Sequence, residues 1–247
     1  MSTFPFQRLQ SELAVLISRT QAGERLPSEP ELAKKMGVSR ATLREAMRTF
    51  ETQGLIRRRQ GAGTFVVGRV PVLESGLEIL ESLDTMAKRL GMEISPSAMR
   101  IEKIYADQEL ADGLNMPLAS RLTRIQRVMN ANGRPVAYLI DTLPEEVLQP
   151  QQLPDDFTGS VLDFLLEKDV ALTVSRAEIS AIGASSDVAR ALEIQRGDVL
   201  LQFRSQLYIA DGRVVDYSVS NFIPGYFKFH VVRRVDKFTT VLNGQSE

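Results

Sequence analysis

Cysteine is absent from the 247 residues of this chain, and histidine occurs once. The absence of cysteine excludes disulfide bonds and thiolate metal sites. The single histidine, His230, lies in the apolar run 227–232, where we expect it to be packed rather than catalytic. Because His230 is the only histidine, no other residue could form a histidine–nucleophile pair. The sequence also shows no cluster of metal ligands and no glycine-rich phosphate loop after a strand. The sequence therefore predicts no catalytic residue, no metal ion and no cofactor.

Long hydrophobic runs are also missing. No apolar stretch approaches the roughly 20 residues that cross a bilayer. The N-terminus lacks the basic and then apolar layout of a signal peptide. We therefore expect a soluble, cytoplasmic protein without a membrane partner.

The chain as a whole has almost no net charge, but its two parts carry opposite charges. The net charge is −1, yet residues 1–70 carry 12 Lys and Arg against 6 Asp and Glu, and the remaining residues carry 18 against 25. A chain of this length can hold two domains, each with its own core. A basic head on an acidic body suits a protein that presents one end to DNA.

Local cues in residues 23–67 predict two short helices joined by a tight turn. Ser28 and Glu31 have the spacing of a capping box before an apolar run. Gly37 is placed to end that helix in a left-handed conformation, and Ser39 then caps a second helix. The order helix, short turn, helix is that of a helix-turn-helix.

The second helix (residues 40–53) has the side chains that DNA reading requires. In a helix-turn-helix the first turn of this helix enters the major groove. Arg40 and Arg44 lie four residues apart and so share a face, and each guanidinium can bond both acceptors of a guanine edge. Ser39, Thr42 and the free N–H groups of the helix suit phosphate oxygens.

The run 55–67 predicts a hairpin that would form a wing beside the helices. Its first strand carries three consecutive arginines, at positions 57 to 59. At the turn, Gln60 and Gly61 can approach a minor groove closely because glycine has no side chain to obstruct it.

Residues 23–67 resemble the winged helix-turn-helix of the GntR regulators through the segments LPSE, GVSR, TLREA and QGAGTFV. Two positions depart from the family: Pro30 stands where many relatives carry an arginine directed at phosphate, and Ala41 stands where many carry threonine. The resemblance implies DNA contacts at Arg40, Thr42, Arg44 and Gly61. The candidate DNA-binding residues are Ser28, Ser39, Arg40, Ala41, Thr42, Arg44, Arg58, Gln60, Gly61 and Gly63.

The second half of the chain contains a faint repeat. Each unit reads strand, helix, strand, tight turn, strand, over residues 100–144 and again over 173–224. Gly133 and Gly212 supply the positive φ that the hairpin turns require. Two such units bury their apolar faces most simply as one antiparallel sheet flanked by helices. Both a ligand cleft at the joint between the halves and a purely structural duplication agree with this pattern.

The predicted fold class is α+β, with a winged helix-turn-helix followed by an antiparallel-sheet domain. Further helices are expected at 6–19, 77–90 and 161–168, and a last strand at 227–235. The expected domains are residues 1–68 for DNA binding, 69–76 as a linker, and 77–240 for effector binding and dimerisation.

Residues 77–238 resemble, more loosely, the UTRA effector-binding domain of the HutC branch of GntR regulators, which is related in fold to chorismate lyase. The markers are RIQRVMNANGRPVA, GDVLLQF, and GRVVDYS followed by YFKFH. In the family an arginine on the first hairpin and an acidic residue before a Tyr-Ser pair line the pocket, which implies Arg127 and Asp216 here. The candidate effector-binding residues are Arg127, Met129, Tyr138, Ser160, Asp216, Tyr217 and Phe222.

The class of effector follows from a departure from the family. Relatives that bind phosphosugars tend to carry a second arginine where Met129 stands. A dianionic group requires paired donors. We therefore expect an effector with at most one anionic group, oriented by Arg127 and packed against Tyr138, Met129 and Phe222.

These features favour a homodimeric transcriptional repressor that binds an inverted repeat in double-stranded DNA and is controlled by a small-molecule metabolite. An enzyme acting on a small carboxylate through the lyase-like domain is the main alternative. A winged helix used only for protein contacts is a third. The missing catalytic groups weigh against the enzyme, and Arg40 and Arg44 weigh against a role in protein contacts alone.

Overall fold

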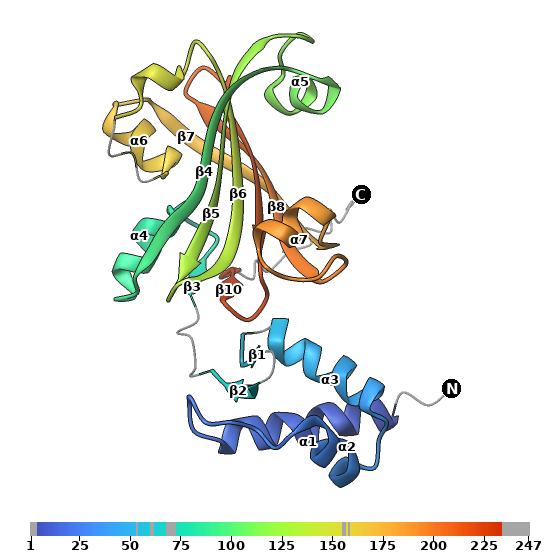
Figure 1. The fold of residues 1–247 in the computed structure, drawn as a ribbon. Helices are drawn as coiled ribbons and strands as arrows, with labels where there is room; N and C mark the ends of the chain where they lie inside the picture. The colour runs from blue at the N-terminus through green and yellow to red at the C-terminus, as the bar shows by residue number, and fades with distance from the viewer. Residues whose placement is uncertain are drawn as a thin grey trace, which may run out of the picture.

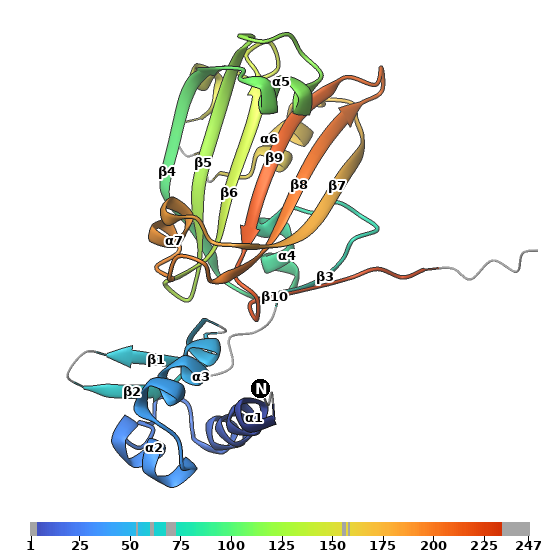
Figure 2. The same cartoon turned by 90° about the vertical axis from the view of Figure 1, so that its right-hand side faces the viewer.

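The computed structural model describes residues 4–52, 54–59, 62–67, 73–154, 157 and 159–233 (Figure 1). Within these ranges the side chains of four helical residues are not described: Phe4, Pro5, Gln7 and Thr52. The described residues form a small head (residues 4–67) and a larger sheet domain (residues 73–233), which lies above the head in Figures 1 and 2.

The head consists of three helices and a two-stranded hairpin. The elements are α1 (Phe4–Arg19), α2 (Glu29–Met36), α3 (Arg40–Thr52), β1 (Ile56–Arg59) and β2 (Gly63–Val66). One apolar core joins them, in which α1 contributes Leu9, Leu13 and Ile17 from one face. The helix-turn-helix and its wing are therefore confirmed as local structure.

The turns between the head's helices follow from local hydrogen bonds. The Glu31 carboxylate accepts from both the backbone N–H and the hydroxyl of Ser28, at 2.8 and 2.7 Å. Gly37 ends α2 with φ 65°. The Ser39 hydroxyl accepts from the backbone N–H of Thr42 at 3.0 Å and caps α3.

The sheet domain has the internal symmetry that the repeat predicts. Its six strands lie in the order β4-β5-β6-β9-β8-β7, so the two halves meet where β6 pairs with β9. All neighbouring pairs are antiparallel. The strands are β4 (Ile94–Tyr105), β5 (Arg121–Ala131), β6 (Arg134–Pro144), β7 (Leu172–Gly183), β8 (Val199–Ile209) and β9 (Val214–Phe222).

Helices cover both faces of this sheet (Figures 1 and 2). We call one the α6 face, which α4 (Leu83–Arg89) and α6 (Val161–Glu167) cover, and the other the α5 face, which α5 (Gln108–Leu114) and α7 (Ser186–Ala191) cover. A short 3-10 helix η1 (Pro150–Gln152) precedes α6. The predicted α+β class with an antiparallel sheet is confirmed.

Part of the predicted linker is a strand instead. Residues 69–72 lie outside the described residues, but β3 (Leu73–Gly76) pairs in parallel with β10 (Phe227–His230). The predicted helix from residue 77 begins only at Leu83, because Ser82 caps it there by accepting from the N–H of Thr85 at 3.0 Å. The predicted continuation of the last strand past residue 233 lies outside the described residues.

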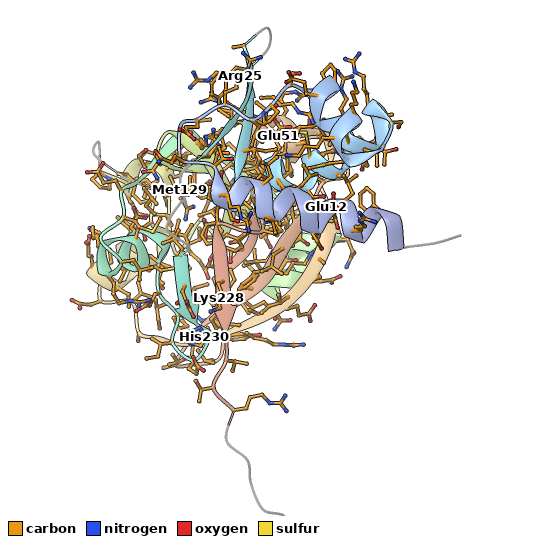
Figure 3. The ribbon with its side chains drawn as sticks, turned by 90° about the horizontal axis from the view of Figure 1, so that it is seen from below. Glu12, Arg25, Glu51, Met129, Lys228 and His230 are labelled. Atoms are coloured by element: carbon orange, nitrogen blue, oxygen red, sulfur yellow. The ribbon has the colours of Figure 1, made fainter. Side chains whose placement is uncertain are left out.

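The expectation that His230 is packed in the interior is wrong. Its side chain is 46% exposed, with Nδ1 3.8 Å from the Glu74 carboxylate. It lies beside Lys228 on β10 (Figure 3). The residue belongs to an apolar run in the sequence, but β10 is a short strand at the border of the domain, so every second side chain faces outward.

Candidate nucleic-acid interface and effector site

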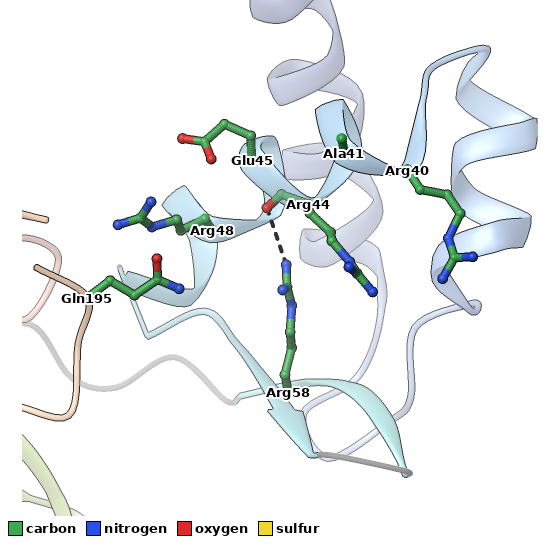
Figure 4. A pocket seen from close by; sticks show the side chains of 7 residues that line it. All are labelled: Arg40, Ala41, Arg44, Glu45, Arg48, Arg58 and Gln195. Atoms are coloured by element: carbon green, nitrogen blue, oxygen red, sulfur yellow. Dashed lines mark hydrogen bonds between the residues drawn. The ribbon is translucent and has the colours of Figure 1, made fainter. Parts of the chain in front are cut away.

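Three arginines of α3 line the helix: Arg40 and Arg44 are exposed, and Arg48 is half-buried beside Gln195 of the sheet domain (Figure 4). Arg40, Arg44 and Arg48 are four residues apart, so they share one side of the helix. They border an open cavity of about 660 Å³. Its lining is strongly basic and consists of Arg40, Ala41, Arg44, Glu45, Arg48, Arg58 and Gln195.

Glu29, at the start of α2, orients two of these basic side chains. Its carboxylate lies 2.7 Å from Arg44 Nε and 3.8 Å from Arg58 Nε. Arg58 also donates to the backbone carbonyl of Arg44 at 3.2 Å and lies 3.5 Å from Glu51 (Figure 4). The wing strand is thereby tied to α3.

The wing hairpin is shaped by a glycine. Gly63 has φ +111°, and a Cβ there would lie 2.4 Å from the Arg25 side chain. Arg25 lies beside the hairpin (Figure 3) and forms a β-bridge with Phe65, whose ring lies 5.1 Å from the Arg59 guanidinium carbon. The predicted wing-tip residues Gln60 and Gly61 lie outside the described residues.

Half of the ten predicted DNA-binding residues lie at the start of α3. Five of them are exposed together: Ser39, Arg40, Ala41, Thr42 and Arg44. Ser28 is half-buried and its hydroxyl is engaged by Glu31. Sequence reasoning missed Glu29, Arg25, Arg48 and Gln195, because their positions near the cavity or wing depend on contacts between separate elements.

A buried charge cluster lies on the α6 face where the two halves of the sheet meet. Arg127 on β5 forms an ion pair with Asp141 on β6, and both side chains are largely buried. Asp216 on β9 is buried next to them and accepts from the backbone N–H of Thr142 at 3.2 Å. Burial raises the pKa of Asp216 well above its usual value, and the Asp141 charge raises it further, against the opposing effect of Arg127.

The N-termini of α4 and α6 adjoin this cluster. Ser82, which caps α4, donates to the Asp163 carboxylate at 2.7 Å, and Ser160 caps α6 by accepting from the Asp163 N–H at 3.2 Å. Gly159 packs on Arg127, since a Cβ there would lie 2.7 Å from Arg127 Cδ. Arg127 Nε is buried without a hydrogen-bond partner among the described residues. It is a donor available to a ligand atom.

The predicted effector site is divided by the sheet. Arg127 is two residues from Ile125, which packs with α6, so both project from the α6 face. Tyr138 pairs with Val128, one residue from Arg127, and so projects from the α5 face. Tyr217 also lies on the α5 face, packed with α5. The expectation that both tyrosines share a pocket with Arg127 is wrong, because strand pairing places them behind the sheet.

The other predicted contacts stay on the α6 face. Met129 and Phe222 occupy one row across the sheet, since both pair with Ala137. Met129 is fully buried, whereas Phe222 lines a small apolar cavity of about 190 Å³ near β8 and the turn before β10. Four predicted effector contacts therefore lie on the α6 face: Arg127, Met129, Ser160 and Asp216. Phe222 lies on the same face, at the end of the sheet nearest β10.

Replacing Asp216 by asparagine is expected to change the pH dependence of stability. The pKa of Asp216 is raised in the folded state, so its contribution is complete below the unfolded pKa and is lost as the pH rises through the folded value. As the pH rises above the pKa that Asp216 has in the unfolded chain, about 3.9, the free energy of unfolding of the wild type should fall relative to that of Asp216→Asn. Urea unfolding of both proteins measures this, and parallel pH curves would contradict it.

Other kinds of site are absent from the described part of the chain. No group of three or more histidine, aspartate or glutamate side chains there is placed to hold a metal ion. Among the helices of the described ranges, none has the length and apolarity needed to cross a membrane.

Known proteins match both parts of the chain. Residues 7–66 match the bacterial regulatory proteins of the gntR family, and residues 89–228 match the UTRA domain. The transcriptional repressor NagR of Bacillus subtilis is 32% identical over 79% of this chain and 79% of its own. The histidine utilization repressor of Pseudomonas putida is 32% identical over 74% of this chain and 73% of its own. The crystal structure of PhnF from Mycobacterium smegmatis shares the fold, with a TM-score of 0.63 and 21% identity over 92% of this chain and all of that one.

Proposed function

This chain belongs to the GntR family of bacterial regulatory proteins, and from that premise we propose that it acts as a cytoplasmic homodimer on an inverted-repeat operator. It is a DNA-binding transcriptional regulator of the HutC type with a UTRA effector-binding domain, and not an enzyme. NagR and the histidine utilization repressor are both repressors, and the lyase-like alternative finds no support among these relatives. We infer that this chain also represses transcription.

The arginine face of α3 is the observation that carries the proposed mode of DNA binding. Arg40 and Arg44 are exposed at the start of α3, where a helix-turn-helix meets base edges. One head covers half a site, and a two-fold dimer covers two inverted half-sites about one helical turn apart. Residues 1–68 would bind DNA and residues 77–240 would bind the effector and dimerise, and the segment 69–76 between them includes strand β3 of the sheet domain.

Binding to the promoter of its own operon tests this proposal. A labelled duplex with two inverted half-sites should bind at least about tenfold more tightly than one with a single half-site, because dimer binding to two sites is bivalent. Fluorescence anisotropy gives both affinities, and sedimentation gives the mass of the free protein and of the complex. Equal affinities, or a monomer on the full site, would contradict the dimer.

The effector is proposed to bind on the α6 face beside Arg127. Met129, Ser160, Asp216 and Phe222 lie on that face as the other candidate contacts, and Tyr138 and Tyr217 are left out because they lie behind the sheet. A ligand oxygen there would accept from the unpartnered Arg127 Nε.

Charge limits the class of effector. Arg127 is already paired with Asp141, and Asp84 and Asp163 add acidic groups nearby. Burial raises the pKa of Asp84, against the effect of the Arg127 charge. A dianionic phosphate would need paired donors that these residues do not supply, so we propose a ligand with at most one anionic group. Tight calorimetric binding of a hexose 6-phosphate would contradict this.

Control of transcription then requires that the two heads of the dimer can adopt two arrangements, and that the protein binds the effector with a different affinity in each. A ligand shifts such an equilibrium only by its differential affinity for the two states. The α6 face reaches the head through β3 and β10, which lie at the end of the sheet nearest the head (Figure 2). The effector is therefore proposed to act by changing how the heads are held.

A further inference from the structure

Among the described residues, two close contacts between the head and the sheet domain lie near the C-terminal end of α3. At the first, Arg48 of α3 forms an ion pair with Asp198 in the turn that precedes β8. At the second, Gly54 lies against the Tyr226 side chain so closely that a Cβ on Gly54 would lie 2.1 Å from the Tyr226 hydroxyl oxygen. The orientation of α3 is thus set by the body of the protein.

The turn that carries Asp198 is rigid. One Asp198 oxygen accepts from the Gln195 N–H at 2.9 Å, while the other accepts from Arg48. The Asp198 N–H donates to the Gln195 carbonyl at 3.1 Å. Two further backbone bonds of 2.8 Å join the turn to Ala184, at the start of the α7 segment. The carboxylate is therefore held in place rather than free to swing away, and its side chain is only 9% exposed.

This carboxylate lies at one end of the DNA-reading face. Arg48 continues the line of Arg40 and Arg44, about 12 Å further along the helix than Arg40. Gln195 of the same turn lines the basic cavity together with these arginines (Figure 4). A phosphate strand that follows this line of arginines would meet the fixed negative charge of Asp198. It would also approach the sheet domain, whose residues 73–233 carry 23 acidic against 16 basic groups.

We propose that Asp198 is an intramolecular competitor of DNA for Arg48, so that the docked arrangement of the head is one with lower affinity for DNA. When the ion pair opens, Arg48 becomes available to a phosphate of the DNA. The turn that contains Gln195 and Asp198 then no longer borders the DNA-binding surface of α3. This inference rests on the DNA-binding function stated above and adds the residue through which the sheet domain restrains it.

Asp198→Asn is the direct test. The asparagine oxygen can still accept from the Gln195 N–H, so the turn is kept, while the negative charge that holds Arg48 is removed. Affinity for the operator duplex should rise about fivefold, the upper end of the range for an exposed ion pair, because the Arg48 and Asp198 side chains are only 30% and 9% exposed. Anisotropy titrations of the wild type and Asp198→Asn at the same salt concentration measure it.

Asp187→Asn is the matched control, because Asp187 is an exposed acid of α7 that pairs within its own helix with Arg190. This control removes the same charge from the sheet domain and should leave affinity within about 1.5-fold of the wild type, the scale of screened surface charges. A similar gain in both variants would mean that overall charge, and not the contact with Arg48, sets the affinity.

A second measurement reports the arrangement itself. Because the chain has no cysteine, dyes can be attached at Lys34→Cys in α2 and Arg190→Cys in α7 for energy transfer. Transfer should be high in the free protein, fall when operator DNA binds, and be reduced without DNA by Asp198→Asn. Unchanged or weaker DNA binding by Asp198→Asn, or transfer that DNA does not alter, would overturn the proposal. Failure of the wild type to bind any promoter duplex would instead refute the regulatory function.

Discussion

Replacing Arg40 and Arg44 together by alanine is expected to weaken operator binding by two to four orders of magnitude. Each bidentate contact of a guanidinium with guanine contributes roughly 1–3 kcal/mol of discrimination. Both side chains are exposed, and the ion pair of Arg44 with Glu29 is 56% exposed on the arginine side, so little folding stability is lost. Anisotropy with the operator duplex measures the affinity, and thermal unfolding checks the fold.

The control for this variant removes two arginines elsewhere. Arg176 of β7 and Arg190 of α7 are 68% and 78% exposed and belong to the sheet domain. Their joint replacement by alanine should leave operator affinity within about twofold of the wild type, because exposed charges outside the interface are screened. If the variant lacking Arg40 and Arg44 bound the operator as the wild type does, the DNA interface would lie elsewhere on the molecule.

Replacing Asp141 and Asp216 together by asparagine is expected to lower the free energy of unfolding by about 3–5 kcal/mol, the range for leaving a buried charge without its partner. Arg127 would then have neither carboxylate beside it. Asp141→Asn alone should have a much smaller effect. Burial still raises the pKa of Asp216 in that variant, but the added effect of the Asp141 charge is gone and the Arg127 charge, which lowers this pKa, remains, so Asp216 can ionise to face Arg127. Urea unfolding of the single and double variants gives the comparison.

A third substitution distinguishes loss of the ion pair from loss of packing. Adding Arg127→Met to the double variant removes the unpaired guanidinium while keeping an apolar side chain of similar length, and most of the lost stability should return. If the double variant were as stable as the wild type, or its effect were the sum of the two single effects, the three groups would not act as one buried cluster.

Much of the head could be predicted from its sequence because its cues are local. Ser28 with Glu31, and Ser39 with Thr42, are three residues apart, and their hydrogen bonds close within one helical turn. Gly37 adopts the left-handed conformation that ends α2. These capping contacts join residues that are close in the sequence and do not depend on the rest of the fold. The spacing of the residues is therefore enough to predict them.

The effector site could be predicted only in part. Alternation within one strand shows which of its residues project from the same face of the sheet. The pairing register decides which residues of the neighbouring strand project from that same face. Arg127 and Tyr138 lie on different strands of one hairpin, and a shift of one residue would have put them together. The same register brings Asp141 to Arg127, although nothing near Asp141 in the sequence marks it as the partner.

By itself, the sequence determined the winged head, the duplicated strand order and the basic side chains at the start of α3, since short-range spacing and hydrophobic periodicity specify each of them. Only the tertiary structure decided that Glu29 holds Arg44, that two tyrosines lie behind the sheet, and that Asp198 meets Arg48 across 150 positions of the chain. The reason is physical: a charge finds its partner according to how separately formed elements pack, and that packing has no local signature.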